Sequence, residues 1–351
     1  MMESKKDWDL ELSEYIKQGE TNKIEKTKAW EAAIGLQDVD GLKPSKYLIE
    51  TAKEHIEGNI DIEQAKYRIN EYYKEINTIK NDNRMEEADK VAVRIAEILS
   101  ENTFTFSVSE LLNIHKRLFS GIYEEAGKFR NYNFTKNEWV LNNDTVIYSS
   151  YDTIKDTLDY DFEQEREFVY KGLGIDEAIK HLCRFTSNIW QIHPFCEGNT
   201  RTTAVFIIKY LRTFGFNIND DVFAENSWYF RNSLVRANYK NFEKNVFEDL
   251  SFLEKFFYNL LTNEKYELKN RYTHIDNNKN MNMDYSQVKK YTLEQQAIIN
   301  ILKNDPSTTQ EKIAIEINKS LRTVKTLMAD LRKKGLVERE KGKKNGTWII
   351  K

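Results

Sequence analysis

The sequence predicts a mainly α-helical protein with one small β-hairpin in its middle, a helical domain at the amino terminus and a winged helix-turn-helix domain at the carboxyl terminus. Apolar residues recur at helical spacing along most of the chain. Only three prolines occur, and Pro44, Pro194 and Pro306 each stand at a break between periodic segments. Strand signals are confined to two short stretches, so helices dominate.

The composition is ordinary for a soluble protein, with 40% hydrophobic and 31% charged residues and a net charge of −3 over 351 residues. This length accommodates two or three domains. No apolar run approaches the length of a membrane span, and the first residues lack a signal-peptide core. Cys183 and Cys196 are the only cysteines, which excludes a disulfide framework and predicts a cytoplasmic protein.

Breaks in composition and periodicity divide the chain into four parts. We expect an N-terminal helical domain at 1–95, a central domain at 96–265, a linker at 266–290 that is rich in Asn, Lys and Asp, and a winged helix-turn-helix domain at 291–351. The helices expected before the linker span residues 30–36, 46–55, 61–79, 91–99, 109–119, 176–192, 202–214 and 227–239. Ser45 is the expected N-cap of the second of them.

Residues 139–148 give the clearest β signal in the first two thirds of the chain. Trp139–Leu141 and Thr145–Tyr148 are expected to be short strands, with Asn142–Asp144 as the turn between them. A lone hairpin is not stable by itself, so we expect it to lie against the helical body. Arg130, shortly before it, is expected to be a structural tie.

Nine residues between two apolar helices carry most of the chemistry. The first helix ends before Pro194, because the residue before a proline disfavours the α region, and Gly215 is expected to end the second. The intervening residues are His193, Pro194, Phe195, Cys196, Glu197, Gly198, Asn199, Thr200 and Arg201.

These residue types are typical of a site for a nucleotide triphosphate. Gly198 and Asn199 tolerate positive φ, so backbone N–H groups can form an anion nest at the start of the second helix. Arg201 adds a guanidinium suited to phosphate. Glu197 would repel phosphate unless a divalent cation bridges the two, and His193 can accept a proton near neutral pH.

Two other interpretations stay open on the residues alone. A histidine at a helix end is commonly a capping or core residue. His193 and Glu197 could also be a zinc pair at i and i+4, but zinc needs a third protein ligand and the other histidines are scattered.

The loop resembles the motif of the Fic (filamentation induced by cAMP) family, His-Pro-Phe-x-Asp/Glu-Gly-Asn-Gly/Lys-Arg, and departs from it only at Thr200. Family members typically transfer AMP from ATP to a hydroxyl side chain of a target protein. The resemblance implies a Fic-type helical bundle in which His193 is the base and Glu197 holds Mg²⁺ (or Mn²⁺). The phosphate ligands that it implies are Gly198, Asn199, Thr200 and Arg201.

Two further parts of the resemblance lie outside the motif. The expected hairpin resembles the Fic flap, whose edge registers an extended target segment, and Ile147 or a neighbour would clamp the acceptor side chain. The helix at 227–239 resembles the one that borders the adenine, which implies Phe230 and Asn238 as adenine contacts. Helical spacing alone predicts instead that this apolar face of the helix packs into the core.

Thr200 separates this chain from the two main branches of the family. Gly at this position is typical of AMP transferases, and Lys is typical of the Doc-like kinases. Because Thr lacks the Lys charge, we expect AMP transfer. A β-branched residue here would cost about 1 kcal/mol if its φ were unusual.

Residues 34–61 resemble the VbhA-like antitoxins that accompany Fic domains. In those proteins, the glutamate of a Ser/Thr-x-x-x-Glu-Gly/Asn helix pairs with a second motif arginine and blocks productive ATP binding. Here Asp40 takes the glutamate position and Ala204 takes the position of the second arginine. We therefore expect the inhibitory pair to be absent or weak.

The segment 291–351 predicts three helices and a hairpin. Thr292 is expected to cap the first helix and Thr308 or Thr309 the second, the third spans 321–334, and the hairpin spans 335–350. From Asn318 to Lys351 there are 11 Lys/Arg against 3 Asp/Glu, which leaves −11 for the rest of the chain. This asymmetry predicts DNA contact by the third helix and the wing. Protein docking or a homodimer is the alternative role.

Together these features predict a Mg²⁺-dependent protein adenylyltransferase that uses ATP, modifies an unidentified protein and releases pyrophosphate, with auto-AMPylation as an option. The rival is a DNA-binding transcriptional regulator whose Fic domain only senses a nucleotide, which Thr200 and Ala204 favour. Removal of AMP from modified targets is a third option. No membrane partner is expected.

Overall fold

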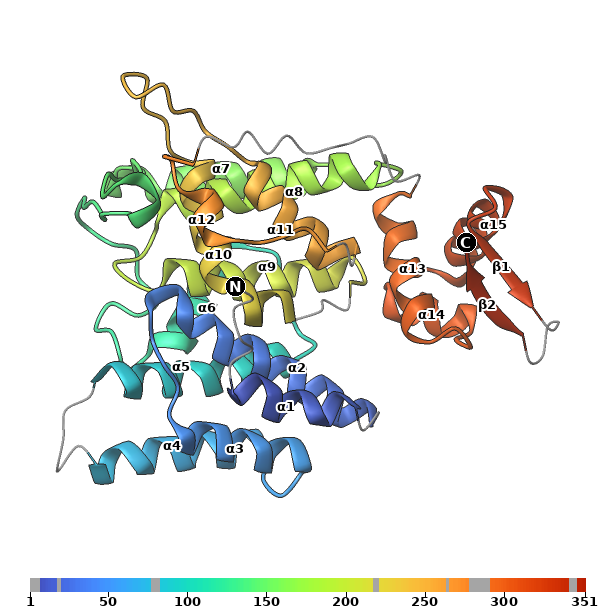
Figure 1. The fold of residues 1–351 in the computed structure, drawn as a ribbon, viewed down its shortest axis with the longest axis horizontal. Coiled ribbons are helices and arrows are strands. Elements are labelled where there is room, and N and C mark those ends of the chain that lie inside the picture. The colour runs from blue at the N-terminus through green and yellow to red at the C-terminus, as the bar shows by residue number, and fades with distance from the viewer. Residues whose placement is uncertain are drawn as a thin grey trace.

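The computed structural model describes residues 7–17, 20–76, 83–216, 221–262, 265–277, 291–340 and 346–351. The chain is mainly helical, as predicted (Figure 1). The N-terminal elements are α1 (Asp7–Lys17), α2 (Thr21–Gly35), the 3-10 helix η1 (Leu36–Asp40), α3 (Lys46–Glu57), α4 (Ile62–Ile76) and α5 (Asn83–Ser100). The central elements are α6 (Val108–Phe119), η2 (Trp139–Leu141), η3 (Tyr151–Thr153), α7 (Ile154–Glu167), α8 (Ile175–Ile192), α9 (Asn199–Thr213), α10 (Asp221–Ala237), α11 (Ser251–Thr262) and α12 (Asn270–Thr273). The C-terminal elements are α13 (Leu293–Asn304), α14 (Gln310–Glu316), α15 (Leu321–Lys333), β1 (Val337–Glu340) and β2 (Thr347–Ile350).

Helices α1 to α5 occupy the blue-to-cyan side of the molecule in Figure 1. Ser45 caps α3 as predicted, because its hydroxyl accepts from Leu48 N at 3.0 Å, and Asp89 of α5 accepts from Ser45 N at 2.9 Å. Helix α2 begins well before the predicted start at Trp30. The predicted end of the 61–79 helix lies outside the described residues. The domain boundary expected after residue 95 falls inside α5, so this helix is shared by both parts.

Helices α8 and α9 form the central hairpin of the fold. Both were predicted, but α9 begins at Asn199, directly after the loop, rather than at residue 202. Every residue of α9 from Asn199 to Leu211 is buried, because the helix contacts α5, α6, α8 and η1. Gly215 follows it at φ 83°, which confirms the predicted glycine stop. A helix enclosed on all sides fixes the orientation of the loop at its N-terminal end.

The prediction of a β-hairpin at residues 139–148 is wrong. Trp139–Leu141 form the 3-10 turn η2, and the flanking chain meets in an isolated bridge between Glu138 and Asp144. Asn142 and Asn143 have left-handed φ values of 56° and 64°, which reverse the chain before strands can extend. We call residues 131–150 the flap loop. It lies against the helical body, as expected, and Glu138 pairs with an arginine of α10 at 2.6 Å.

Helices α13 to α15 and the β1–β2 hairpin build the predicted winged helix, shown in orange and red in Figure 1. Thr292 forms a capping box with Gln295, Thr309 caps α14 and Ser320 caps α15. Residues 341–345 and residues 278–290 of the predicted linker lie outside the described residues, and the described part of that linker contains the short helix α12.

The winged helix is docked on the central hairpin through main-chain contacts. Ile175 N donates to Tyr291 O at 3.0 Å and Leu293 N donates to Leu173 O at 3.3 Å, which joins the start of α13 to the start of α8. Asn300 of α13 also donates to the carbonyl of Leu261 in α11 at 2.8 Å. Among the described helices, none combines the length and apolar character that a membrane crossing requires.

Candidate active site

The loop between α8 and α9 is closed by its own residues. His193 ends α8 in the left-handed region (φ 51°, ψ 59°), and Gly198 precedes α9 at φ 77°. Phe195 N donates to Asn199 Oδ1 at 2.9 Å, and Asn199 Nδ2 donates to Phe195 O at 2.7 Å. Asn199 itself is helical. Of the two residues expected to allow positive φ in the nest, Gly198 adopts it and Asn199 does not.

His115 of α6 fixes the loop backbone, and nothing in its spacing along the sequence pointed to this role. Gly127 N donates to its Nδ1 at 2.8 Å, so Nε2 carries the proton and donates to the Glu197 carbonyl at 3.0 Å. The imidazole stacks on Phe195 with ring centroids 3.7 Å apart. Burial lowers the pKa of His115 to about 4. The ring is therefore neutral at neutral pH and holds the main chain at Glu197.

Arg130 is a structural tie, as predicted. Its guanidinium donates to the carbonyls of His193 and Tyr132, each at 2.8 Å, and to that of Ser149. Its backbone N donates to Pro194 O at 2.9 Å. Arg130 therefore joins the α8–α9 loop to both ends of the flap loop.

His193 has one ring nitrogen that is prepared to accept a proton. Nδ1 lies 3.2 Å from the Trp190 carbonyl, and since a carbonyl can only accept, Nδ1 carries the hydrogen and Nε2 the free lone pair. Nε2 is buried and has no hydrogen-bond partner among the described residues. Burial, and then the positive charge of Lys136, hold the pKa of His193 well below its usual 6.5. The imidazole is neutral at neutral pH.

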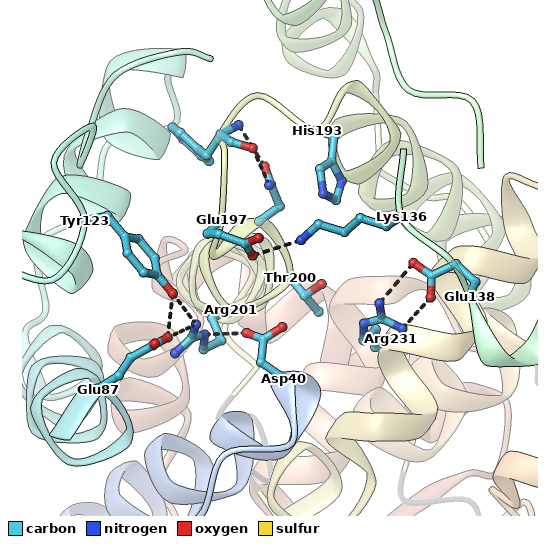
Figure 2. Close-up of polar contacts among 12 residues, drawn as sticks. Asp40, Glu87, Tyr123, Lys136, Glu138, His193, Glu197, Thr200, Arg201 and Arg231 are labelled. Carbon is cyan, nitrogen blue, oxygen red and sulfur yellow. Dashed lines mark hydrogen bonds and ion pairs between the residues drawn. The ribbon is translucent and has the colours of Figure 1, made fainter. Parts of the chain in front are cut away.

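The flap loop covers this imidazole. Tyr148 stacks on His193 with ring centroids 3.9 Å apart, and the Phe134 ring lies edge-on at 5.7 Å. His193 is consequently only 3% exposed. Figure 2 shows the ring directed toward the Lys136 side chain and the Glu197 carboxylate. A hydroxyl group that reaches Nε2 must displace part of this cover.

Glu197 places its carboxylate at the mouth of the loop, where it pairs with Lys136 of the flap loop. Lys136 Nζ lies 2.9 Å from Glu197 Oε2, and the Glu197 side chain is 52% exposed. A single accessible carboxylate fits Mg²⁺, which proteins bind through one or two carboxylates while phosphate oxygens and water supply the remaining ligands. The described residues contain no group of three side chains able to hold a metal ion, so the zinc alternative has no third ligand there.

Thr200 lies within the first turn of α9, so the strain cost considered for an unusual φ does not arise. Its hydroxyl accepts a hydrogen bond from Trp190 Nε1 at 3.0 Å, and the residue is buried. The side chain is thus turned into the helical body. What Thr200 can offer an anion at the helix start is its backbone N–H.

Arg201 is 1% exposed and pairs with acids from two N-terminal elements (Figure 2). Nε lies 2.9 Å from Asp40 Oδ2 of η1, an ion pair without hydrogen-bond geometry, and Nη2 donates to Glu87 Oε1 of α5 at 2.6 Å. Burial lowers the pKa of Arg201, but the negative charges of Asp40 and Glu87 outweigh this effect and raise the pKa overall. The expectation that Asp40 lacks a cationic partner is wrong. Its partner is the motif arginine itself, while Ala204 is buried.

Phe230 does not have the position that the family resemblance implied. It is fully buried, and its ring lies 5.1 Å from that of Phe223 and 4.9 Å from that of Phe256, centroid to centroid. The adenine contact predicted for Phe230 is therefore wrong, because the apolar face of α10 packs into the core. The alternative that spacing alone suggested is the correct one.

The roles predicted for Asn238 and Ile147 stay predictions. Asn238 follows the end of α10, where Nδ2 donates to Leu234 O at 2.9 Å and to Ser187 O at 3.2 Å. Ile147 is 79% exposed on the flap loop, while Gln191 donates to its carbonyl at 3.0 Å. Its side chain is free to meet another chain.

The crystal structure of a Fic family protein from Desulfovibrio desulfuricans G20 matches 99% of this chain and 97% of its own, with a TM-score of 0.44 and 12% identity. The protein adenylyltransferase VbhT of Bartonella schoenbuchensis is 32% identical over 116 residues, which are 33% of this chain and 23% of that protein. The chain thus matches less than a quarter of that relative's length. The Fic/DOC family model matches residues 105–211, and a winged helix-turn-helix DNA-binding model matches residues 295–338. The part of the chain that holds the α8–α9 loop is therefore a Fic domain, and it is followed by a winged helix-turn-helix domain.

Proposed function

We propose that the Fic domain transfers AMP from ATP to a hydroxyl side chain of a protein. The observation that carries this proposal is the state of His193, a neutral imidazole with an unpaired Nε2, whose ring points toward the side chain of Lys136, the partner of Glu197 (Figure 2). The name of the 32%-identical relative, an adenylyltransferase, supports the same reaction. The position of Gly198 before a buried helix supports phosphate binding, because the first N–H groups of α9 have no intrahelical partners.

In the proposed reaction, the target hydroxyl oxygen forms a bond to the α-phosphorus of ATP. The bond from that phosphorus to the oxygen bridging to the β-phosphate breaks, and pyrophosphate leaves with the electron pair. His193 Nε2 takes the hydroxyl proton, while the Trp190 carbonyl keeps the proton on Nδ1 and stabilises the imidazolium that forms. Glu197 would hold Mg²⁺, which when bound neutralises phosphate charge.

Transfer is tested with ATP labelled at the α-phosphate and, separately, at the γ-phosphate. Purified protein with Mg²⁺ should become labelled, or should label lysate proteins, from the α-labelled ATP only. His193→Ala should abolish the label while ATP binding persists. Label from the γ-phosphate would instead indicate a kinase. Tight ATP binding without any transfer would favour the nucleotide sensor.

A second function, DNA binding, is supported by the exposed face of α15. Arg322, Lys325 and Lys333 are exposed, whereas Val324 and Met328 pack inward. A basic helix face of this kind enters the major groove in winged helices. Replacing Arg322 and Lys325 by Ala should weaken binding to random-sequence duplex DNA and reduce its salt dependence by about one unit of slope per lost phosphate contact. Unchanged binding would assign the domain to protein docking.

A further inference from the structure

We propose that Lys136 is the internal counter-ion of Glu197 and competes with the divalent cation for that carboxylate. The inference rests on the proposed Mg²⁺–ATP site. It concerns a residue of the flap loop outside the motif, and it explains how an acidic side chain can lie beside a triphosphate site when no metal is held.

Both partners of this contact are held in position by other parts of the chain. The Glu197 backbone is fixed by the 3.0 Å hydrogen bond from His115. Lys136 N lies 3.3 Å from Thr145 Oγ1 across the flap loop. Two residues further on, Glu138 is anchored by a bidentate pair with Arg231 at 2.6 and 3.0 Å. The ammonium is therefore delivered to the carboxylate by a braced segment rather than by a loose surface side chain.

The contact is nevertheless open to exchange. The side chains are 27% exposed for Lys136 and 52% exposed for Glu197, so solvent cations can reach the carboxylate. Lys136 has a long aliphatic stem, and its ammonium also lies 5.8 Å from the Phe134 ring centroid, a favourable contact that does not depend on Glu197. A divalent cation can thus take the carboxylate while Lys136 stays near the aromatic ring.

Lys136 should therefore have opposite effects on the affinity for the metal-free nucleotide and on the affinity for its metal complex. While Lys136 neutralises Glu197, a metal-free triphosphate meets no net negative charge there. Without Lys136, the bare carboxylate repels the metal-free triphosphate but attracts its metal complex more strongly. A residue that only supports the fold would change both affinities in the same direction.

The test uses the full chain, Mn²⁺ and the non-hydrolysable β,γ-imido analogue of ATP. Lys136→Met should bind the Mn²⁺ complex about tenfold more tightly than wild type, equivalent to about 1.4 kcal/mol. It should bind the metal-free analogue more weakly. Lys136→Arg keeps the charge and should behave like wild type. Lys244→Met is a matched control, because Lys244 pairs with Asp144 of the flap loop at 3.2 Å and not with Glu197.

A separate titration with Mn²⁺ alone, monitored by electron paramagnetic resonance, distinguishes failure of the proposed transferase function from failure of the counter-ion role of Lys136. If wild type binds neither form of the nucleotide, the proposed transferase function fails, and the Mn²⁺ titration decides the role of Lys136. Tighter Mn²⁺ binding by Lys136→Met than by wild type and Lys244→Met supports the counter-ion role. Equal Mn²⁺ affinities, or nucleotide affinities that shift together, would overturn it.

Discussion

Replacing Asp40 by Asn should tighten ATP binding, because Asp40 pairs with Arg201, the guanidinium that the proposed function assigns to the triphosphate. Two unit charges about 4 Å apart attract by about 4 kcal/mol at an effective dielectric constant of 20. Asp40 is 30% exposed, so solvent screening reduces this to roughly 1–2 kcal/mol. The substitution also removes a negative charge that would repel the phosphates. We therefore expect about a 5- to 30-fold increase in ATP affinity.

The substitution should leave the fold intact, since Arg201 keeps other partners. Glu87 accepts from Nη2 at 2.6 Å, Gln37 accepts from Nη1 at 3.2 Å, and the Tyr123 hydroxyl accepts at 3.2 Å. A buried guanidinium that retains a carboxylate avoids the penalty of an unpaired buried charge. A point substitution is preferable to removal of residues 1–95, which would cut α5 and take Glu87 away as well.

Isothermal titration with the β,γ-imido analogue in the presence of Mg²⁺ measures the effect. Asp38→Asn removes the same charge from the same 3-10 turn and serves as the control. Unchanged or weaker affinity for Asp40→Asn would show that Asp40 does not limit access to Arg201. It would restore the expectation from sequence that the inhibitory pair is ineffective.

Two further predictions concern stability. Gly198→Ala should destabilise the protein in urea more than Gly58→Ala. Both glycines have positive φ, but an added Cβ at 198 would lie 2.3 Å from the Phe119 ring, while one at 58 would meet no atom within 4 Å. Equal losses of stability in the two variants would contradict the close approach of Gly198 to Phe119. His55→Gln should reduce the loss of stability in acid. Burial, and then the charge of Lys26, lower the pKa of His55 in the folded protein from 6.5 to about 4. Unfolding therefore takes up a proton, and stability falls as the pH drops from about 6.5 to 4. Urea titrations at pH 7 and pH 4 should show a pH-dependent loss about 3 kcal/mol smaller for the variant, and equal losses would mean that His55 is not neutral in the fold.

The parts of the fold that could be predicted from sequence are those governed by local chemistry. Apolar periodicity located α8 and α9, and Pro194 and Gly215 located their ends. Hydroxyl caps at Ser45, Thr292 and Thr309 were found because the capping interaction spans only three residues. The residues of the α8–α9 loop were found because they are contiguous in the chain.

The errors occurred where distant contacts decide the structure. In the flap loop, two residues with left-handed φ and the Glu138–Arg231 pair replace the strand pairing that β-branched residues suggested. Family resemblance predicts that Phe230 contacts the adenine, whereas its helical spacing also fits the core in which it lies. The partners of Arg201 come from η1 and α5, and no spacing along the chain could bring them together.

The two ion pairs at the loop have different physical origins. Arg201 is buried, so its charge must be compensated whether or not a nucleotide is present, and Asp40 and Glu87 provide that compensation. Glu197 is half exposed and water alone could solvate it, so its pairing with Lys136 is not required for folding. In the proposed function, a Mg²⁺–triphosphate complex carries both signs of charge, so it would replace a carboxylate at Arg201 and the ammonium at Glu197 together. Replacing the carboxylate partner of the buried Arg201 costs more free energy than replacing the ammonium partner of the half-exposed Glu197. We therefore infer that Asp40 sets how tightly the nucleotide binds, whereas Lys136 sets how strongly that binding depends on the metal.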